Sequence, residues 1–309
     1  MKVKNNPKVG VLIQTYNDGK YLIDALKSIQ NQTYKNIQIF IYDDGSSKKN
    51  QKIYLKYIKQ NNFTYIYGNN RGIVKASNNL LKIARKSNCQ LFAKMDGDDL
   101  SHKSRIRLQV KYLIKNNLDL VGCNFYRIGK SGKILERNYC SLSKVSMFNR
   151  LCVESIFAHG SILFKRDLID KNILKYKSLK SKTPYPEDYN MFCSLFRKIK
   201  IGSINKFLYT HRFHNKSYSF ENRKIYNNQL KISSKLFFKK NKKIFKEYNE
   251  NFNLNNFFDL LIYLKILFRH KNFNNFWFVK KLTKSLKIQY LFQIIFYYLH
   301  RKFLKFFYA

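Results

Sequence analysis

The strongest constraint on the fold is an alternation of short β-rich runs and amphipathic helical runs between Val9 and Ile128. Strands are predicted at residues 9–14, 37–42, 63–67, 91–95 and 120–128, and helices at residues 21–29, 53–58, 73–84 and 104–115. The connections are short, so neighbouring strands joined by a helix run in the same direction. We therefore predict an α/β fold, with a mostly parallel central sheet that helices cover on both faces.

Carboxylates are concentrated at the carboxyl ends of two predicted strands and at the start of one predicted helix. They form three short clusters, Asp43-Asp44, Asp96-Gly97-Asp98-Asp99 and Glu187-Asp188. In a sheet of this kind, ligands bind at the carboxyl ends of the strands, where the first two clusters lie. Adjacent carboxylates repel one another unless they share a positive charge, and a hard cation prefers oxygen ligands. The sequence therefore predicts a divalent cation, Mn²⁺ or Mg²⁺, as cofactor.

The chain is strongly basic, with 60 Lys and Arg against 18 Asp and Glu and a net charge of +42. This excess favours an anionic membrane surface or nucleic acid as partner, although a composition rich in Lys, Asn and Ile is also typical of an AT-rich genome. Nucleic-acid binding gives no reason for the acidic clusters, which would repel phosphates, so we expect no nucleic-acid partner. Regular apolar spacing and 45% hydrophobic residues exclude a disordered polycation.

The sequence changes character near Arg223. From there to the end it has nineteen Lys and Arg but only three acidic residues, and no run of about 18 apolar residues that could span a membrane. Aromatic residues beside cations at 290–308 are typical of a helix in a membrane interface, but packing on the first domain or on a partner subunit stays open. We predict a domain at 1–222 and a basic, aromatic-rich helical extension at 223–309.

Two further features concern the location of the protein. The five cysteines are widely spaced and form no metal-binding or C-x-x-C pattern, which predicts reduced thiols: Cys89, Cys123, Cys140, Cys152 and Cys193. Residues 1–17 pass directly from a polar lead into a β-like run without an apolar signal segment. We therefore expect a cytoplasmic location, including the inner face of the cytoplasmic membrane.

Three motifs occur in a fixed order: VLIQTYN at 11–17, IYDDGSS at 41–47 and MDGDD at 95–99. Together they resemble the inverting glycosyltransferases of family 2, which have the fold called GT-A. The resemblance continues through Asn70-Arg71-Gly72, Glu187-Asp188-Tyr189 and the segment 209–214, and it covers residues 8 to about 220. Residues 223–309 match no part of the family pattern.

The resemblance implies a nucleotide-sugar site. It assigns donor binding to Thr15, Tyr16, Asn17, Asp43, Asp44, Arg71 and Asp96. Asp44 would accept a hydrogen bond from the uracil N3–H, a buried contact that discriminates between bases. Asp43 would orient either the loop or the base, and a helix-capping role for it stays open, as does a solvated surface role for Arg71.

The same resemblance implies the metal ligands and the catalytic base. Asp98 and His214 would hold the cation beside the donor diphosphate, and Asp188 would be the general base that deprotonates the acceptor hydroxyl. Glu187 and His159 would line the acceptor side, and a purely structural role for His159 stays open. Two acids that open a helix can also simply complement its dipole, so this alternative for Glu187 and Asp188 stays open.

These expectations combine into a hexosyl- or N-acetylhexosaminyltransferase that moves sugar from a nucleotide-sugar, expected to be a UDP-sugar, to a glycan or lipid-linked acceptor in polysaccharide assembly. Two other classes are weighed. A nucleotidyltransferase also needs carboxylates and a metal, but it would favour a Gly-rich phosphate loop after the first strand, which this sequence lacks. A basic nucleic-acid-binding protein without catalysis would explain the charge but not the acidic clusters.

Overall fold

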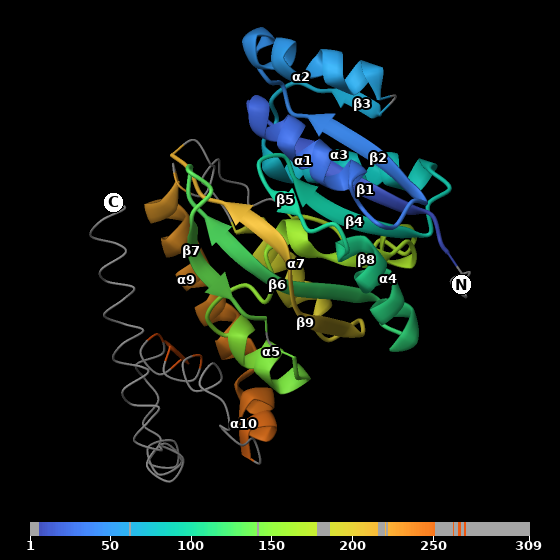
Figure 1. Ribbon diagram of the computed structural model, residues 1–309. Helices are drawn as coiled ribbons and strands as arrows, with labels where there is room; N and C mark the ends of the chain where they lie inside the picture. Colours follow the sequence, from blue (N-terminus) through green and yellow to red (C-terminus); the bar gives the residue numbers. More distant parts are fainter. Residues whose placement is uncertain are drawn as a thin grey trace.

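The structure is a computed structural model that describes residues 6–61, 63–140, 142–177, 186–215, 220, 222–250, 262, 265, 266 and 269. Its centre is a nine-stranded sheet with the order β3-β2-β1-β4-β8-β6-β9-β5, and β7 pairs with β6 (Figure 1). The strands are β1 (Val9–Thr15), β2 (Ile37–Asp43), β3 (Thr64–Tyr67), β4 (Leu91–Asp96), β5 (Leu100–Ser101), β6 (Leu120–Ile128), β7 (Ile134–Asn138), β8 (Leu163–Lys165) and β9 (Ile201–Arg212).

The sheet is mixed but mostly parallel, as predicted. β1 is parallel to β2 and β4, β2 is parallel to β3, and β6 is parallel to β9. β8 runs antiparallel to both β4 and β6, so β6 and β9 point in the same direction as β1. The carboxyl ends of these six strands therefore lie at one edge of the sheet, and only β5, β7 and β8 run the other way.

Helices cover the first half of the sheet as the apolar spacing predicts. They are α1 (Lys20–Gln30), α2 (Lys48–Gln60), α3 (Ile73–Lys86) and α4 (Arg105–Lys115). Every residue of β1 except Gln14 is buried, which requires cover on both faces of the sheet. On α2, Tyr54 and Ile58 are buried as expected, whereas Ile53 is exposed because α2 lies at the outer edge beside β3.

A second group of helices follows β7 and packs beside β6 (Figure 1). Apart from a 3₁₀ turn at His159–Ser161, which lies against β4, and α6 (Asp167–Asp170), which lies against α3 and β8, it comprises α5 (Lys144–Leu151), α7 (Glu187–Leu195), α9 (Arg223–Lys240) and α10 (Lys242–Glu250). Phe148 of α5 is the centre of this group, because its ring lies 5.7 Å from that of Phe237 on α9 and 5.3 Å from that of Tyr248 on α10. The two C-terminal helices therefore contact the first domain.

The described part of the C-terminal extension shares the hydrophobic core of the domain. Phe238, Phe245, Ile262 and Ile266 are all buried in that core. The described part of the extension therefore packs on the first domain, which is one of the alternatives that the sequence left open. A domain boundary at residue 222 and a membrane-interfacial role stay predictions, and the aromatic segment at 290–308 lies outside the described residues.

We expect Phe238→Ala to lower the free energy of unfolding by about 3–5 kcal/mol, because a buried aromatic ring is removed from α9. The matched control is Leu236→Ala on the same helix, where the side chain is 63% exposed and the expected change is below about 0.5 kcal/mol. Urea denaturation of both full-length variants measures this difference. Equal stability of the two variants would show that α9 does not contribute to the core.

Two further sequence predictions can be compared with the structure. All five cysteines are free thiols in the structure and four of them are buried, while the reduced state inferred from their spacing stays a prediction. Among the described residues, no helix combines the length and the apolar character that crossing a bilayer requires.

Candidate active site

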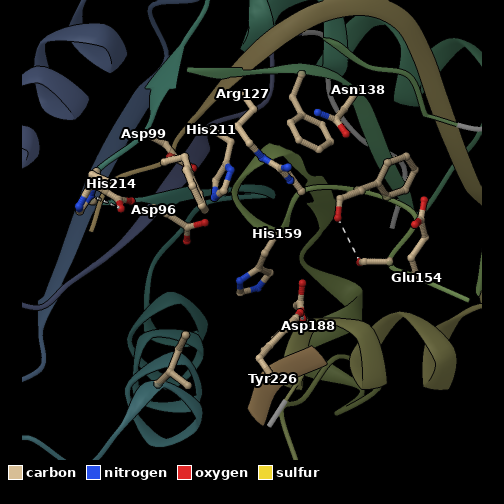
Figure 2. A pocket seen from close by; sticks show the side chains of 18 of the residues that line it. Asp96, Asp99, Arg127, Asn138, Glu154, His159, Asp188, His211, His214 and Tyr226 are labelled. Carbon is tan, nitrogen blue, oxygen red and sulfur yellow. Dashed lines mark hydrogen bonds and ion pairs between the residues drawn. The ribbon is translucent and has the colours of Figure 1, made fainter. Parts of the chain in front are cut away.

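A cavity of about 2160 Å³ opens at the edge where the parallel strands end (Figure 2). Strand register brings the predicted residues together there, because Thr15 pairs with Asp43 and Gln14 pairs with Asp96. Its lining also includes residues from β6, β7, α5, α7 and α9. A single small ligand fills roughly 300–1,000 Å³, so the cavity has room for two substrates side by side.

The loops after β1 and β2 are tied to each other at the cavity rim. The backbone N–H of Asn17 donates to Ser46 Oγ at 2.8 Å, and Asn17 Oδ1 accepts from the backbone of Ser47 at 2.9 Å. Asn17 has a positive φ of 60°, a conformation that asparagine tolerates better than most residues. Thr15, Tyr16 and Asn17 therefore form one rigid wall of the cavity, as predicted for the donor pocket.

Asp43 and Asp44 point in different directions. Asp43 is completely buried and accepts hydrogen bonds from Ser46 N–H and from the hydroxyls of Tyr54 and Tyr65, so it holds the loop and does not line the cavity. Asp44 does line the cavity, and its carboxylate accepts from the backbone N–H groups of residues 71 and 72 at 3.1 and 2.9 Å. Burial raises the pKa of Asp44. The Arg71 side chain is exposed and does not line the cavity.

The Asp96–Asp99 turn is anchored by β9. Asp99 is buried and accepts from the Tyr209 hydroxyl at 2.6 Å and from the Arg212 backbone at 2.7 Å, so it fixes the turn against β9. Asp98 is then presented to the cavity, with its Oδ2 3.1 Å from His214 Nε2. The predicted metal pair, which is 116 residues apart in sequence, is thus brought together in the fold.

Asp18 is a further carboxylate of this cluster that sequence reasoning missed. It lines the cavity and accepts a hydrogen bond from Thr15 Oγ1 at 2.7 Å. Burial, with the nearby charge of Asp98, raises the pKa of Asp18 well above its ordinary value. Gly97 makes this approach possible, because a Cβ there would lie 2.2 Å from Asp18 Oδ2. One signal in the sequence could have identified Asp18: like other acids of this cluster, it comes just after a predicted strand.

The donor set fits a divalent cation that also binds a nucleotide. Adjacent ligands of an octahedral ion with bonds of 2.0–2.1 Å lie about 3 Å apart, and the Asp98 oxygen and the His214 nitrogen are separated by 3.1 Å. In the described part of the chain, no group of three or more His, Cys, Asp or Glu side chains could hold an ion alone. Asp98 and His214 would therefore supply two of the ligands of such an ion.

His159 and Asp96 lie between the aspartate cluster and α7. His159 Nε2 is 2.6 Å from the Tyr176 hydroxyl, and burial lowers the pKa of His159 to about 3, so its imidazole is neutral at pH 7. Burial opposes ionisation of Asp96, but the ammonium of Lys94, 3.4 Å away, brings its pKa below the ordinary value. Asp96 is thus a stable carboxylate, and His159 is an uncharged hydrogen-bonding group on the cavity wall.

Glu187 and Asp188 open α7 and line the cavity, and Figure 2 shows Asp188 well separated from His214, with His159 between them. Asp188 Oδ1 accepts from the Tyr189 backbone at 2.7 Å and from the Tyr226 hydroxyl of α9 at 3.2 Å. Burial raises the pKa of Asp188, which makes its carboxylate a stronger base than an exposed one. Burial together with the charge of Asp188 raises the pKa of Glu187 well above its ordinary value, which favours its protonated form.

Three more residues line the cavity, although the sequence around them does not indicate a place in the site. Tyr226 reaches Asp188 only because α9 packs on α7, and Arg127 and His211 face the cavity because they pair across β6 and β9. Burial and the neighbouring Arg127 lower the pKa of His211 to about 4. Of the predicted site residues, all except Asp43 and Arg71 line the cavity.

Comparison with known sequences decides the family. The model of the family described as "Glycosyl transferase family 2" matches residues 10–173, which is more than half of the chain. The chain belongs to glycosyl transferase family 2. The matched segment contains the loops after β1, β2 and β4, which carry the three motifs from which the resemblance was first inferred.

Curated members of the family are distant relatives. An uncharacterised glycosyltransferase of Rickettsia conorii is 28% identical over 205 residues, which cover 66% of this chain and 33% of that protein. The chain thus spans only a third of the length of this relative. The Escherichia coli O-antigen biosynthesis glycosyltransferase WbnJ is 27% identical over 214 residues, which cover 68% of this chain and 81% of WbnJ.

Solved structures confirm the GT-A type of fold. The mannosyltransferase PcManGT from Pyrobaculum calidifontis, in complex with GDP-Man and Mn²⁺, aligns with a TM-score of 0.58 at 15% identity and covers 98% of this chain and 84% of its own. Residues 1–349 of S. aureus TarS, in complex with UDP-GlcNAc, align with a TM-score of 0.54 at 15% identity, covering 85% of this chain and 81% of that fragment. The predicted fold class is therefore confirmed.

Proposed function

We propose that this chain transfers a sugar from a nucleotide-sugar to a hydroxyl of a glycan or lipid-linked acceptor, with inversion at the sugar carbon. One observation carries the proposal: Asp188 lies across a single large cavity from the Asp98–His214 pair. This arrangement gives a base on one side and a diphosphate site on the other. An inverting displacement needs that separation, because the nucleophile attacks the face opposite the leaving group.

The donor occupies the end of the cavity formed by β1, β2 and β4. Thr15, Tyr16 and Asn17 hold the nucleobase, and Asp44 accepts its N3–H, with Asp43 fixing the loop beneath. Asp96 accepts from the ribose hydroxyls. Arg71 contributes its backbone N–H, which holds Asp44 in place. A uracil base suits this site because it offers one N–H donor to the Asp44 carboxylate.

Asp98 and His214 hold Mn²⁺ or Mg²⁺ in this proposal. The cation supplies Lewis-acid stabilisation of the charge on the departing diphosphate. Asp188 accepts the proton of the acceptor hydroxyl while the oxygen of that hydroxyl bonds to the sugar carbon and the bond from that carbon to the diphosphate breaks. Tyr226 orients the Asp188 carboxylate, and His159 and Glu187 offer uncharged hydrogen-bonding groups to the acceptor side.

The acceptor belongs to surface-polysaccharide assembly in this proposal, which the likeness to the E. coli O-antigen glycosyltransferase supports. The boundary of the glycosyltransferase domain is proposed at residue 222, and α9 of the extension contributes Tyr226 to the site by its hydrogen bond to the base.

A donor screen tests the proposed function. UDP-, GDP- and dTDP-sugars are titrated into the protein with Mn²⁺, and the release of the nucleoside diphosphate is followed with acceptor mixtures. We expect UDP-sugars to bind most tightly. A nucleotidyltransferase would instead consume UTP and a sugar phosphate with release of pyrophosphate, and that result would overturn the proposal.

The location proposed for the protein is the inner face of the cytoplasmic membrane. Helix α9 supports it, because Ile225, Ile232 and Leu236 are exposed on its surface and lysines accompany them in sequence. We expect the full-length protein to co-sediment with anionic vesicles, less so as salt rises, because ions screen the lysine charges. Failure to bind anionic vesicles at low salt would contradict this location.

A further inference from the structure

The cavity carries opposite charges at its two ends. Five aspartates line the end at β1, β2 and β4: Asp18, Asp44, Asp96, Asp98 and Asp99. The opposite side contains Glu187 and Asp188 of α7 and, beside them, a surface that we call the basic wall, which is formed by the β6–β7 hairpin, α5, α9 and the cavity-lining residues Ile262, Lys265 and Arg269. Among its described residues the basic wall has seven Lys and Arg side chains but only two carboxylates, Glu136 and Glu154.

The high net charge of the chain does not explain this division, since both ends belong to one cavity. Both carboxylates of the basic wall are already engaged. Glu154 pairs with Arg150 at 3.3 Å and with Lys265 at 2.8 Å, and Glu136 pairs with Arg127 at 2.6 Å. The basic wall therefore has more positive than negative side chains even after these ion pairs are counted.

Two buried donors on the hairpin also point to a ligand. Arg127 Nε and Asn138 Nδ2 are buried, and neither has a hydrogen-bond partner among the described residues. A buried donor left without an acceptor is destabilising, so an acceptor atom is expected there in the working complex. Strand register places both on the same face of the sheet, because Arg127 pairs with Glu136 and Phe125 pairs with Asn138. Figure 2 shows the Arg127 guanidinium between His211 and Asn138.

We propose that Arg127 and Asn138 form an anion-binding subsite for the acceptor, so that the acceptor carries an oxyanion, a phosphate or a carboxylate. The inference rests on the proposed function, which places the donor diphosphate at the aspartate end. An anion on the basic wall therefore belongs to the other substrate. An arginine fork beside a side-chain amide suits an oxyanion, because charge-assisted bonds from guanidinium to phosphate or carboxylate are short, strong and directional.

The test is calorimetry on the full-length protein saturated with UDP and Mn²⁺ in 0.15 M NaCl, which screens unspecific binding to a basic surface. The probes are N-acetylglucosamine 6-phosphate, glucuronate and neutral N-acetylglucosamine. We expect at least one anionic probe to bind more than tenfold tighter than the neutral sugar, and the comparison of phosphate with carboxylate identifies the group. Arg127→Gln should remove this preference, and Asn138→Leu should weaken it several-fold.

Two further variants separate the subsite from folding and from general charge. Arg127→Lys retains the ion pair with Glu136 but lacks the Nε donor, so we expect a folded protein that has lost most of the preference. Lys111→Gln on the exposed surface of α4 removes one positive charge outside the cavity and should change nothing. UDP affinity should stay the same in all four variants.

Three outcomes would overturn the subsite: equal binding of charged and neutral probes, an unchanged preference in Arg127→Gln, or a loss of UDP affinity in that variant, which would assign Arg127 to the donor. Failure of the proposed function gives a different result. In that case UDP does not bind with Mn²⁺, while titration of the anionic probes into the protein without UDP still shows whether Arg127 and Asn138 bind an anion.

Discussion

Asp188→Asn is expected to lower the single-turnover rate of sugar transfer by a factor of about 10²–10⁴ while leaving the affinity for the donor unchanged. The amide has the size of the carboxylate but cannot accept the proton of the acceptor hydroxyl. Asp188 lies on α7, across the cavity from the Asp98–His214 pair, so its loss should not disturb the nucleotide. Rapid-quench measurement of transfer, beside calorimetry of UDP-sugar binding, gives both quantities.

The pH dependence provides an independent check of this base. Because burial raises the pKa of Asp188, the rate for the unmodified protein should fall as the pH drops through a value above the ordinary aspartate pKa of about 3.9. The residual rate of Asp188→Asn should lack this acid limb. Asp170→Asn on the surface of α6 is the matched control and should retain the full rate. A near-normal rate in Asp188→Asn would move the base elsewhere, and Glu187→Gln would then be the next variant to measure.

Asp98→Ala is expected to weaken UDP binding in the presence of Mn²⁺ by at least about tenfold and to abolish the dependence of binding on the metal. Among the described residues, no three acidic, His or Cys side chains form a complete metal site, so the loss of one of two protein ligands leaves His214 with the nucleotide alone. Even partners outside the first coordination shell contribute 10–100-fold to metal affinity, so a direct ligand should contribute at least as much.

Calorimetry of UDP with Mn²⁺ and with EDTA checks this result. The unmodified protein should bind UDP tightly only with Mn²⁺, and Asp98→Ala should bind weakly in both solutions. Asp170→Ala removes a carboxylate outside the cavity and serves as the charge control. If the unmodified protein binds UDP equally well with and without the metal, the assignment of Asp98 and His214 as ligands is wrong.

The first half of the fold was predictable because its signals are local. β1, β2 and β4 are short, mostly apolar and β-rich runs, and α1 and α3 have one apolar face, so the strand-helix alternation follows directly from residue spacing. β5 has only two residues and β7 is half exposed, so neither shows a periodic pattern. β5 is placed by its pairing with β9, which is distant in sequence, and β7 by its pairing with β6 across a register shift. Local residue spacing identifies neither partner.

The candidate site could be predicted at those residues that belong to a family motif. Asp98 and His214 meet as the family pattern implies, although the roles of the site residues stay predictions. Asp18 was missed because an aspartate before a glycine at a helix start looks like an ordinary turn residue. Arg127, Asn138 and Tyr226 have no local signal, since the pairing of β6 with β7 and the packing of α9 on α7 bring them to the cavity.

The hydrogen bond from Tyr226 to Asp188 has a consequence for inhibition and control. It joins the proposed base to α9, whose other contacts lie outside the aspartate end, and it lowers the pKa that burial raises. A molecule that displaced α9 would therefore act at a distance: it would misalign the carboxylate and shift the acid limb of the rate to higher pH without entering the donor pocket. Such an inhibitor would not compete with the nucleotide-sugar.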